Sequence, residues 1–138
     1  MRRLARLTAA IAIPAVVVSG CGGPSKRATN PGGDANRIVA TIKAFNNDPP
    51  SLCKKYGTPN LIRQNFGTRA HCLFYAKQSS AKDPNVAIGK VKFKTVQSRL
   101  YANVVTIAGV EPGVGTKEQV TLVKQGSSWK VDAIIPTR

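Results

Sequence analysis

The residues that could take part in proton transfer are few in this chain of 138 residues. It has one histidine, His71, and six carboxylates. His71, Tyr101 and Asp132 are the group that could supply a general acid and a general base, so an enzyme would have to be built around them. The other five carboxylates fall at expected helix caps, turns or a strand start, which are ordinary structural positions. They are Asp34, Asp48, Asp83, Glu111 and Glu118.

Sequence motifs of catalysis are missing from the chain. It contains no paired carboxylates, no glycine-rich phosphate loop, no HExxH metal motif and no nucleophile elbow. The run from Gly109 to Gly115 is rich in glycine, but no helix start follows it, so we expect a loop between strands. A lone histidine next to a cysteine is typical of a structural or surface position. The sequence therefore predicts a protein that is not an enzyme and that uses no metal or cofactor.

The N-terminus has the charge order of an export signal. Arg2, Arg3 and Arg6 precede an uncharged run over residues 7–18. At about 1.5 Å per residue, this run is well short of the roughly 30 Å of a bilayer core, so a permanent transmembrane helix is not expected. The run is therefore expected to act as the apolar part of a signal peptide.

A possible site of covalent lipid attachment follows at Cys21. Val18, Ser19, Gly20 and Cys21 resemble the lipobox of bacterial lipoproteins. Ser19 and Gly20 are small enough for a signal peptidase cleft, and the Cys21 thiol is the nucleophile that can take a diacylglyceryl group. The resemblance implies cleavage before Cys21, with two or three acyl chains anchoring the protein to the extracytoplasmic face of the cell membrane. The alternative is an ordinary signal peptide in which the cysteine falls by chance.

Cys53 and Cys72 remain as an even pair once Cys21 is lipidated. In an oxidising compartment such a pair is expected to form a disulfide, which would stabilise a small domain by about 3 kcal/mol. The alternative, a metal site or a catalytic thiol, would need another cysteine or a paired histidine nearby, and the sequence provides neither.

The chain is strongly basic, with a formal charge of +15. Removal of Arg2, Arg3 and Arg6 with the signal lowers this to +12 if the Cys21 amine is acylated. Outside the membrane the abundant anions are lipid headgroups and acidic wall polymers, so we expect these, or another envelope protein, as partners and not nucleic acid. The alternative is a basic surface that only keeps the protein soluble.

Periodicity predicts helices in the first half of the domain. Asp34 is expected to cap a helix whose apolar positions share one face. These positions are Ile38, Val39, Ile42 and Phe45. Shorter helices are expected over 51–56, over 60–66 after the cap Thr58-Pro59, and around 69–77.

Strand patterns follow in the second half. Residues 90–95 alternate with lysines, which predicts a half-buried strand with one lysine-covered face. Further strands are expected over 99–108, 117–124 and 129–135, the last two joined by a hairpin at 125–128. Together these elements predict an α+β fold with N-terminal helices packed on a curved antiparallel sheet. The predicted organisation is a signal peptide over 1–20, a flexible linker over 21–33 and the domain over 34–138.

The closing hairpin resembles that of the NTF2-like (SnoaL-like, cystatin-like cone) superfamily. The match rests on Gly126, Trp129, Lys130 and Val131, and Cys53 and Cys72 are similar to the cysteine pair of small NTF2-like lipoproteins. The all-helical stretch before Val86 departs from members that insert an early strand there.

This resemblance implies a cone with a pocket, in which Asp132 could face Tyr75 or Tyr101. Strand alternation instead places Asp132 with Lys130 and Ile134, on a face opposite Val131 and Ala133, and a face that includes lysine is expected to be wet.

The function expected from these features is a non-enzymatic binding or scaffold lipoprotein, which binds an envelope component or an exported protein. Two alternatives stay open. One is a small-molecule enzyme that uses the cone pocket, and the other is an inhibitor or immunity-type lipoprotein with an exposed aromatic patch.

Overall fold

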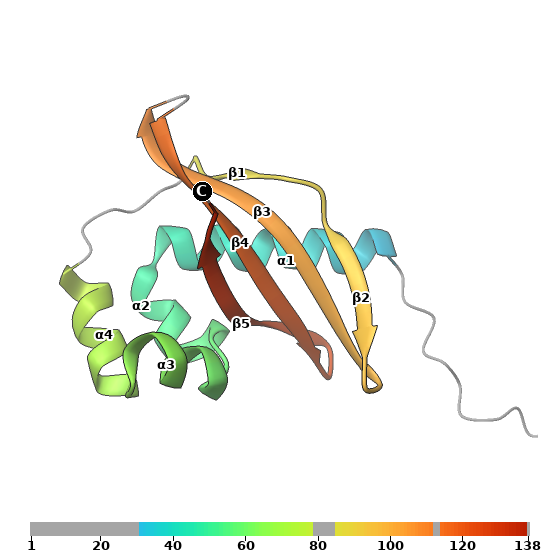
Figure 1. The fold of residues 1–138 in the computed structure, drawn as a ribbon, viewed down its shortest axis with the longest axis horizontal. Coiled ribbons are helices and arrows are strands. Elements are labelled where there is room, and N and C mark those ends of the chain that lie inside the picture. The colour runs from blue at the N-terminus through green and yellow to red at the C-terminus, as the bar shows by residue number, and fades with distance from the viewer. Residues whose placement is uncertain (1–30, 79–84, 112–113, 138) are drawn as a thin grey trace, which may run out of the picture.

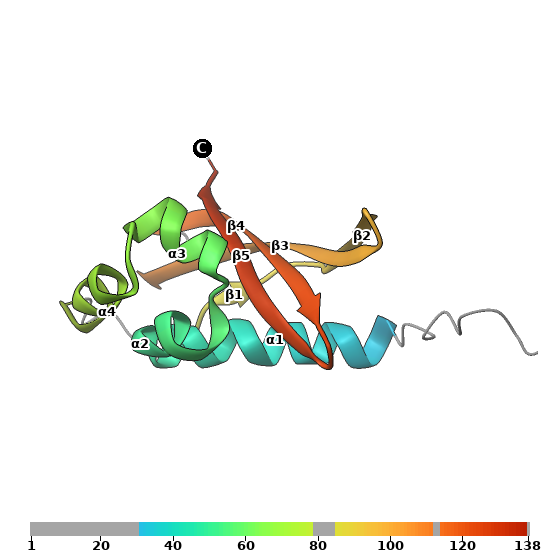
Figure 2. The same cartoon turned by 90° about the horizontal axis from the view of Figure 1, so that it is seen from below.

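The computed structural model describes residues 31–78, 85–111 and 114–137, and these form helices followed by strands. The helices are α1 (Pro31–Asn47), α2 (Pro49–Ser51), the π-helical turn η1 (Leu52–Tyr56), α3 (Pro59–Phe66) and α4 (Arg69–Gln78). The strands are β1 (Ala87–Ile88), β2 (Lys92–Val96), β3 (Arg99–Glu111), β4 (Val114–Gln125) and β5 (Ser128–Pro136). The predicted fold class is confirmed: the protein is α+β, with N-terminal helices packed on a curved antiparallel sheet (Figures 1 and 2).

The sheet is built around β3. Its strand order is β1-β3-β4-β5, and β2 also pairs with β3. These described strand pairings are all antiparallel. Helix α1 lies across one face of the sheet, while α3 and α4 lie at the side of β5 (Figures 1 and 2). The described helices do not include one that is long and apolar enough to cross a membrane.

The core lies between α1 and the sheet. Ile38, Ile42 and Phe45 of α1 are buried, as their helical spacing predicts, whereas Val39 is only partly buried. They pack against buried side chains of β3, β4 and β5. These are Ala102, Val104, Val120, Leu122, Trp129 and Val131. Each fully buried aliphatic side chain contributes about 1.5–3 kcal/mol to folding, so this contact is the main support of the fold.

The predicted disulfide is present. It joins Cys53 in η1 to Cys72 in α4, with Cα atoms 5.8 Å apart. Both cysteines are buried in a second, smaller apolar cluster with Ile62. The bridge therefore ties the short helices together where they have little apolar core of their own.

Helix α3 has the predicted caps. The Thr58 hydroxyl oxygen accepts a hydrogen bond from the Leu61 backbone N–H at 3.1 Å, and Pro59 takes the first helical position. Gly67 ends the helix with a φ of 74°, a conformation that glycine adopts at low cost.

Helix α1 differs from the prediction at its start. It begins at Pro31, so three residues that we assigned to the linker, 31–33, belong to its first turn. Proline suits the first turn because its fixed φ is helical and its missing N–H would have no partner there. Asp34 therefore lies inside the first turn and is not the N-cap.

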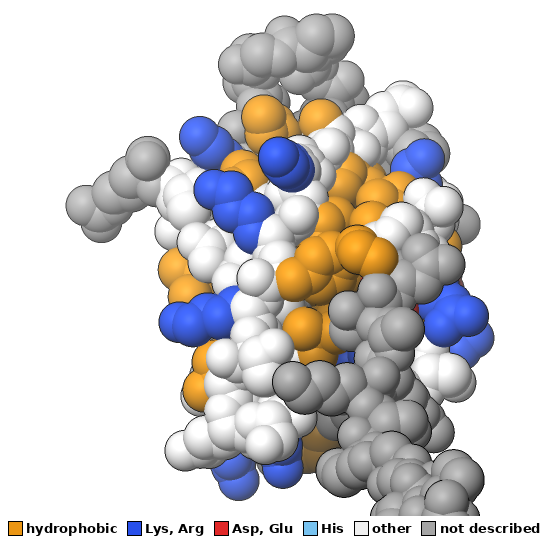
Figure 3. All heavy atoms as spheres, turned by 90° about the vertical axis from the view of Figure 1, so that its right-hand side faces the viewer, with side chains coloured by type: hydrophobic (Ala, Val, Ile, Leu, Met, Phe, Trp, Pro, Cys, Tyr) orange, Lys and Arg blue, Asp and Glu red, His pale blue; other side chains and the backbone are white. Residues whose placement is uncertain are grey.

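Strand β2 is also less buried than predicted. All of its residues are exposed, so both of its faces meet solvent. On the side of the molecule where α1 begins, Lys and Arg side chains surround a band of apolar side chains (Figure 3). The predicted signal peptide, Cys21 and the linker up to residue 30 lie outside the described residues.

Candidate functional site

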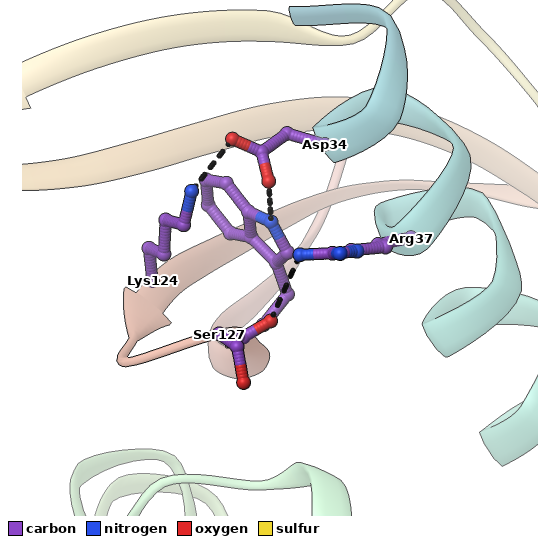
Figure 4. A network of polar contacts seen from close by, with 5 residues as sticks. Asp34, Arg37, Lys124 and Ser127 are labelled. Atoms are coloured by element: carbon purple, nitrogen blue, oxygen red, sulfur yellow. Dashed lines mark hydrogen bonds and ion pairs between the residues drawn. The ribbon is translucent and has the colours of Figure 1, made fainter. Parts of the chain in front are cut away.

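A polar network connects the start of α1 to the hairpin between β4 and β5 (Figure 4). Asp34 is only 4% exposed. Its carboxylate accepts hydrogen bonds from Lys124 Nζ at 2.8 Å and from Trp129 Nε1 at 3.2 Å. Lys124 and Trp129 face each other across the two strands, so both side chains reach the same carboxylate.

The charge state of Asp34 follows from these partners. Burial by itself would raise the pKa of Asp34, but the hydrogen bonds from Lys124 and Trp129 and the positive charges of Lys124 and Arg37 outweigh it. The pKa of Asp34 is therefore lowered from its ordinary value of 3.8. The ionised carboxylate holds the first turn of α1 against the sheet.

Arg37 extends this network by one helical turn. Its Nη1 group donates a hydrogen bond to the Ser127 carbonyl oxygen at 3.5 Å (Figure 4). An arginine has five N–H donors, so this long contact orients the guanidinium without using up its capacity to bind an anion.

Beside Arg37 lies a pocket of about 210 Å³. We call it the cationic pocket. Its lining residues are Arg37, Ala40, Thr41, Lys55, Tyr56, Ser127, Ser128, Trp129 and Lys130. Three of them carry a positive charge, two are aromatic, and no described carboxylate is among them.

The two lysines of the cationic pocket come from elements far apart in sequence. Lys130 of β5 donates a hydrogen bond from Nζ to the Lys55 carbonyl oxygen of η1. Lys55 Nζ lies 5.1 Å from the centre of the Tyr56 ring, within the range of a cation–π contact. The pocket therefore places three cations beside aromatic surface, an arrangement suited to an anionic group with an apolar portion.

The candidate residues Tyr75, Tyr101 and Asp132 lie on three different elements. Tyr75 is on α4 and is 57% exposed, with its ring against Phe74 at 5.7 Å. Tyr101 is on β3, where it pairs with Val123 on the sheet face opposite Ala102. No described hydrogen bond or ring contact joins the three residues, and none of them lines the cationic pocket.

Asp132 has a structural partner instead. Its carboxylate accepts a hydrogen bond from the Thr58 hydroxyl at 2.7 Å, and the same hydroxyl caps α3. The Thr58 backbone N–H donates to the Val131 carbonyl at 2.9 Å. Asp132 thus holds the loop before α3 against the edge of β5.

The predicted alternation along β5 is wrong beyond Val131. The register shifts there, because Leu122 pairs with Val131 whereas Thr121 pairs with Ala133. This bulge leaves Asp132 unpaired and turns Ile134 toward the core that also holds Val131. Alternation assumes one residue per partner, so it could not show this change of face.

His71 is exposed on α4. Its backbone N–H donates to the Thr68 hydroxyl at 3.2 Å, in the first turn of the helix. Within the described part of the chain, no cluster of three or more His, Cys, Asp or Glu residues could hold a metal ion.

Sequence reasoning missed the cationic pocket. Arg37, Lys55 and Lys130 are brought together only by the docking of α1 and η1 on β5, and no local spacing relates them. The sequence feature that could have indicated this pocket is Trp129, which the sequence analysis uses only for the family resemblance.

No protein-family model matches the chain, and no curated protein matches it in sequence. Among solved structures, the chain is similar to a de novo designed protein with a curved β-sheet, with 12% sequence identity and a TM-score of 0.49. That alignment covers 75% of this chain and 99% of the designed chain. The fold and the site define a small α+β protein with a curved sheet and a cationic pocket at one edge.

Proposed function

We propose that this chain is a lipid-anchored, non-enzymatic binding module on the extracytoplasmic face of the cell membrane. In this proposal Cys21 carries the lipid, and an NTF2-like domain binds the phosphate or carboxylate group of an envelope component. The lipobox resemblance of Val18 to Cys21 supports the anchor. The order of helices before a curved antiparallel sheet is consistent with the NTF2-like resemblance.

The observation that carries the binding role is the composition of the cationic pocket. Arg37, Lys55 and Lys130 line it with the buried Trp129 behind them. None of the described lining residues is a carboxylate or a histidine, so the pocket offers positive charge and hydrogen-bond donors but lacks the side chains most often used as general bases. This favours binding of an anion over acid–base catalysis.

The test is a titration of the mature chain with inorganic phosphate, followed by NMR. The backbone amide signals of Ser127 and Ser128, which line the pocket, should shift and saturate. Arg37→Gln combined with Lys130→Gln removes two charge-assisted partners and should weaken the affinity at least about tenfold. Lys43→Gln combined with Lys77→Gln, at exposed positions on α1 and α4, removes the same charge and should leave the affinity unchanged.

Two outcomes contradict the binding role. One is a wild-type protein whose Ser127 and Ser128 signals do not move with phosphate. The other is an equal loss of affinity in the control with Lys43→Gln and Lys77→Gln, which would show that phosphate responds to overall charge and not to the pocket.

A second candidate function is an inhibitor or immunity-type lipoprotein that contacts another protein. It is favoured by Phe74 and Tyr75 on α4, which are 55% and 57% exposed and pack edge to face. Exposed aromatic pairs are typical of protein contacts. A photo-crosslinker at position 74 should form one discrete product in cells if this role holds, and the same group at Gln64 on α3 should form none.

A further inference from the structure

Three segments lie on the same side of the molecule (Figures 1 and 2). They are the β2–β3 hairpin with its turn at Gln97 and Ser98, the β4–β5 turn, and the start of α1. Tyr101 pairs with Val123 close to both turns, and Asp34 of α1 binds Lys124 and Trp129 beside the β4–β5 turn. We call this region, with Arg37 and residues 92–99, the hairpin end.

The hairpin end carries positive charge that nearby acids do not neutralise. Arg37, Lys92, Lys94 and Arg99 are all exposed or partly exposed there. The carboxylate described at this end, Asp34, is buried and paired with Lys124. Asp48 follows the far end of α1, and Glu118 pairs with Pro136 at the other end of the sheet. Asp48 lies roughly 20 Å from Asp34 at a helix rise of about 1.5 Å per residue, and Glu118 lies roughly 20 Å along β4 from Lys124 at about 3.3 Å per residue. Lys92 is the cation nearest to Glu118, at roughly 10 Å along the strand direction, because their partners on β3 are Asn103 and Thr106.

Apolar side chains lie between these cations. Val96 is 41% exposed on β2 and shares a strand face with Lys92, Lys94 and its pairing partner Arg99. Phe93 is 37% exposed on the opposite face, where its ring lies 6.0 Å from the Trp129 ring. Figure 3 views the molecule from this side and shows apolar side chains between groups of Lys and Arg. Exposed apolar side chains within a lysine-rich surface fit the interface of an anionic lipid leaflet, where each basic residue contributes about 1 kcal/mol.

The position of the expected anchor points to the same surface. About ten residues separate Cys21 from the start of α1, and a flexible linker of that length spans roughly 20 Å. Helix α1 begins at the hairpin end (Figures 1 and 2). A lipid on Cys21 would therefore keep the hairpin end, and not the opposite end, close to the bilayer.

We infer that the hairpin end docks on anionic phospholipid headgroups, a proposal that rests on the proposed lipidation of Cys21. Lys92, Lys94 and Arg99 bind the phosphates, and Val96, on the same strand face as these cations, contacts the apolar boundary beneath them. The domain is then oriented on the membrane and is not a freely rotating unit on a tether.

The experiment separates docking from anchoring. The mature chain with Cys21→Ser is mixed with vesicles of phosphatidylcholine, with or without phosphatidylglycerol, and the bound fraction is measured by sedimentation at low salt. The described core and the disulfide all lie between Asp34 and Val131, so this chain keeps the whole folded unit. Binding should require phosphatidylglycerol and should weaken steeply as salt is added.

The variant that tests the surface combines Lys92→Gln, Lys94→Gln and Arg99→Gln. Its binding should weaken on the order of a hundredfold, because three basic contacts are lost. The control combines Lys43→Gln, Arg63→Gln and Lys77→Gln, which removes the same charge from exposed positions on α1, α3 and α4. Val96→Ser, which leaves the charge intact, should weaken binding severalfold.

An equal loss in the control variant, or no binding of the parent chain to phosphatidylglycerol vesicles, overturns the docking proposal. Metabolic lipid labelling of the wild-type protein in cells tests the anchor separately. Failure of labelling with intact vesicle binding would refute the lipoprotein assignment, whereas labelling without vesicle binding would refute docking alone.

Discussion

Asp34 and Glu118 are two carboxyl groups whose surroundings act in opposite directions. Asp34 is buried but receives hydrogen bonds from Lys124 and Trp129, and its pKa is lowered. Glu118 of β4 is partly buried, and burial raises its pKa from the ordinary value of 4.5. At neutral pH the ionised carboxylate of Asp34 therefore stabilises the fold, whereas the ionised carboxylate of Glu118 destabilises it.

The paired substitutions Asp34→Asn and Glu118→Gln should have opposite effects on the free energy of unfolding at neutral pH. Asp34→Asn leaves the partly buried Lys124 without its ion pair and should destabilise the protein by about 1–3 kcal/mol. Glu118→Gln removes a desolvated charge and should stabilise it by less than about 1 kcal/mol, because the side chain is only partly buried.

The contributions of Asp34 and Glu118 to the free energy of unfolding change with pH over different ranges. The contribution of Asp34 is present above pH 3.8 and is lost as the pH falls through its lowered folded-state pKa. The penalty at Glu118 is absent below pH 4.5 and appears as the pH rises through its raised pKa. Urea unfolding at about pH 7 and about pH 2.5 measures both, and differences of equal size at the two pH values would contradict the assignment.

At the scale of the element, the turn between β2 and β3 is strained. Gln97 and Ser98 have φ values of 47° and 64°, in the left-handed region that costs a non-glycine residue about 1 kcal/mol. Two-residue hairpin turns of this kind favour Asn-Gly. The β4–β5 turn has glycine, Gly126, with a φ of 61°, and does not carry this cost there.

Ser98→Gly should therefore raise stability by up to about 1 kcal/mol, or several degrees in the melting temperature. Ser128→Gly, at an ordinary strand position, is the control and should lower stability slightly. A melting temperature that falls in Ser98→Gly would show that the serine side chain makes a contribution larger than the strain.

The short helices depend on their covalent bridge. Replacing both Cys53 and Cys72 by serine opens a loop with a sequence separation of 19 and should destabilise the protein by about 3 kcal/mol. Thermal unfolding should show a melting temperature lower by ten degrees or more, on the order expected for a domain of this size. A free-thiol assay that finds both thiols reactive in the unfolded wild-type protein without reductant would refute the bridge.

Local signals in the sequence were enough to predict the elements and the fold class. The α3 caps at Thr58 and Gly67 and the buried face of α1 depend on neighbours within a few residues, so they can be read along the chain. The bulge opposite Thr121 and the cationic pocket depend on how distant segments pack. The ion pair of Asp34 also depends on the packing of distant segments, because its partner Lys124 lies ninety residues away along the chain. For this reason the sequence indicated a helix cap at Asp34 and not an ion pair.

At the scale of the whole molecule, the proposed anchor decides where the protein works. Cys21→Ala should leave the precursor uncleaved or release the protein, because the thiol that would carry the diacylglyceryl group is gone. Cell fractionation with lipid labelling measures this, and Cys53→Ser serves as the control that keeps the labelled position. Unchanged membrane partition and labelling in Cys21→Ala would refute the lipobox assignment.

The network around Asp34 also gives the molecule an optical reporter. Trp129 is the only tryptophan in the chain, is 2% exposed, and donates its indole N–H to Asp34. It also lines the cationic pocket and lies 6.0 Å from the Phe93 ring at the hairpin end. Its fluorescence emission should therefore respond to undocking of α1, to an anion in the pocket and to lipid at the hairpin end. Trp129 emission can therefore be followed in separate titrations with brominated lipids, phosphate and urea, which test lipid docking, anion binding and undocking of α1 in turn.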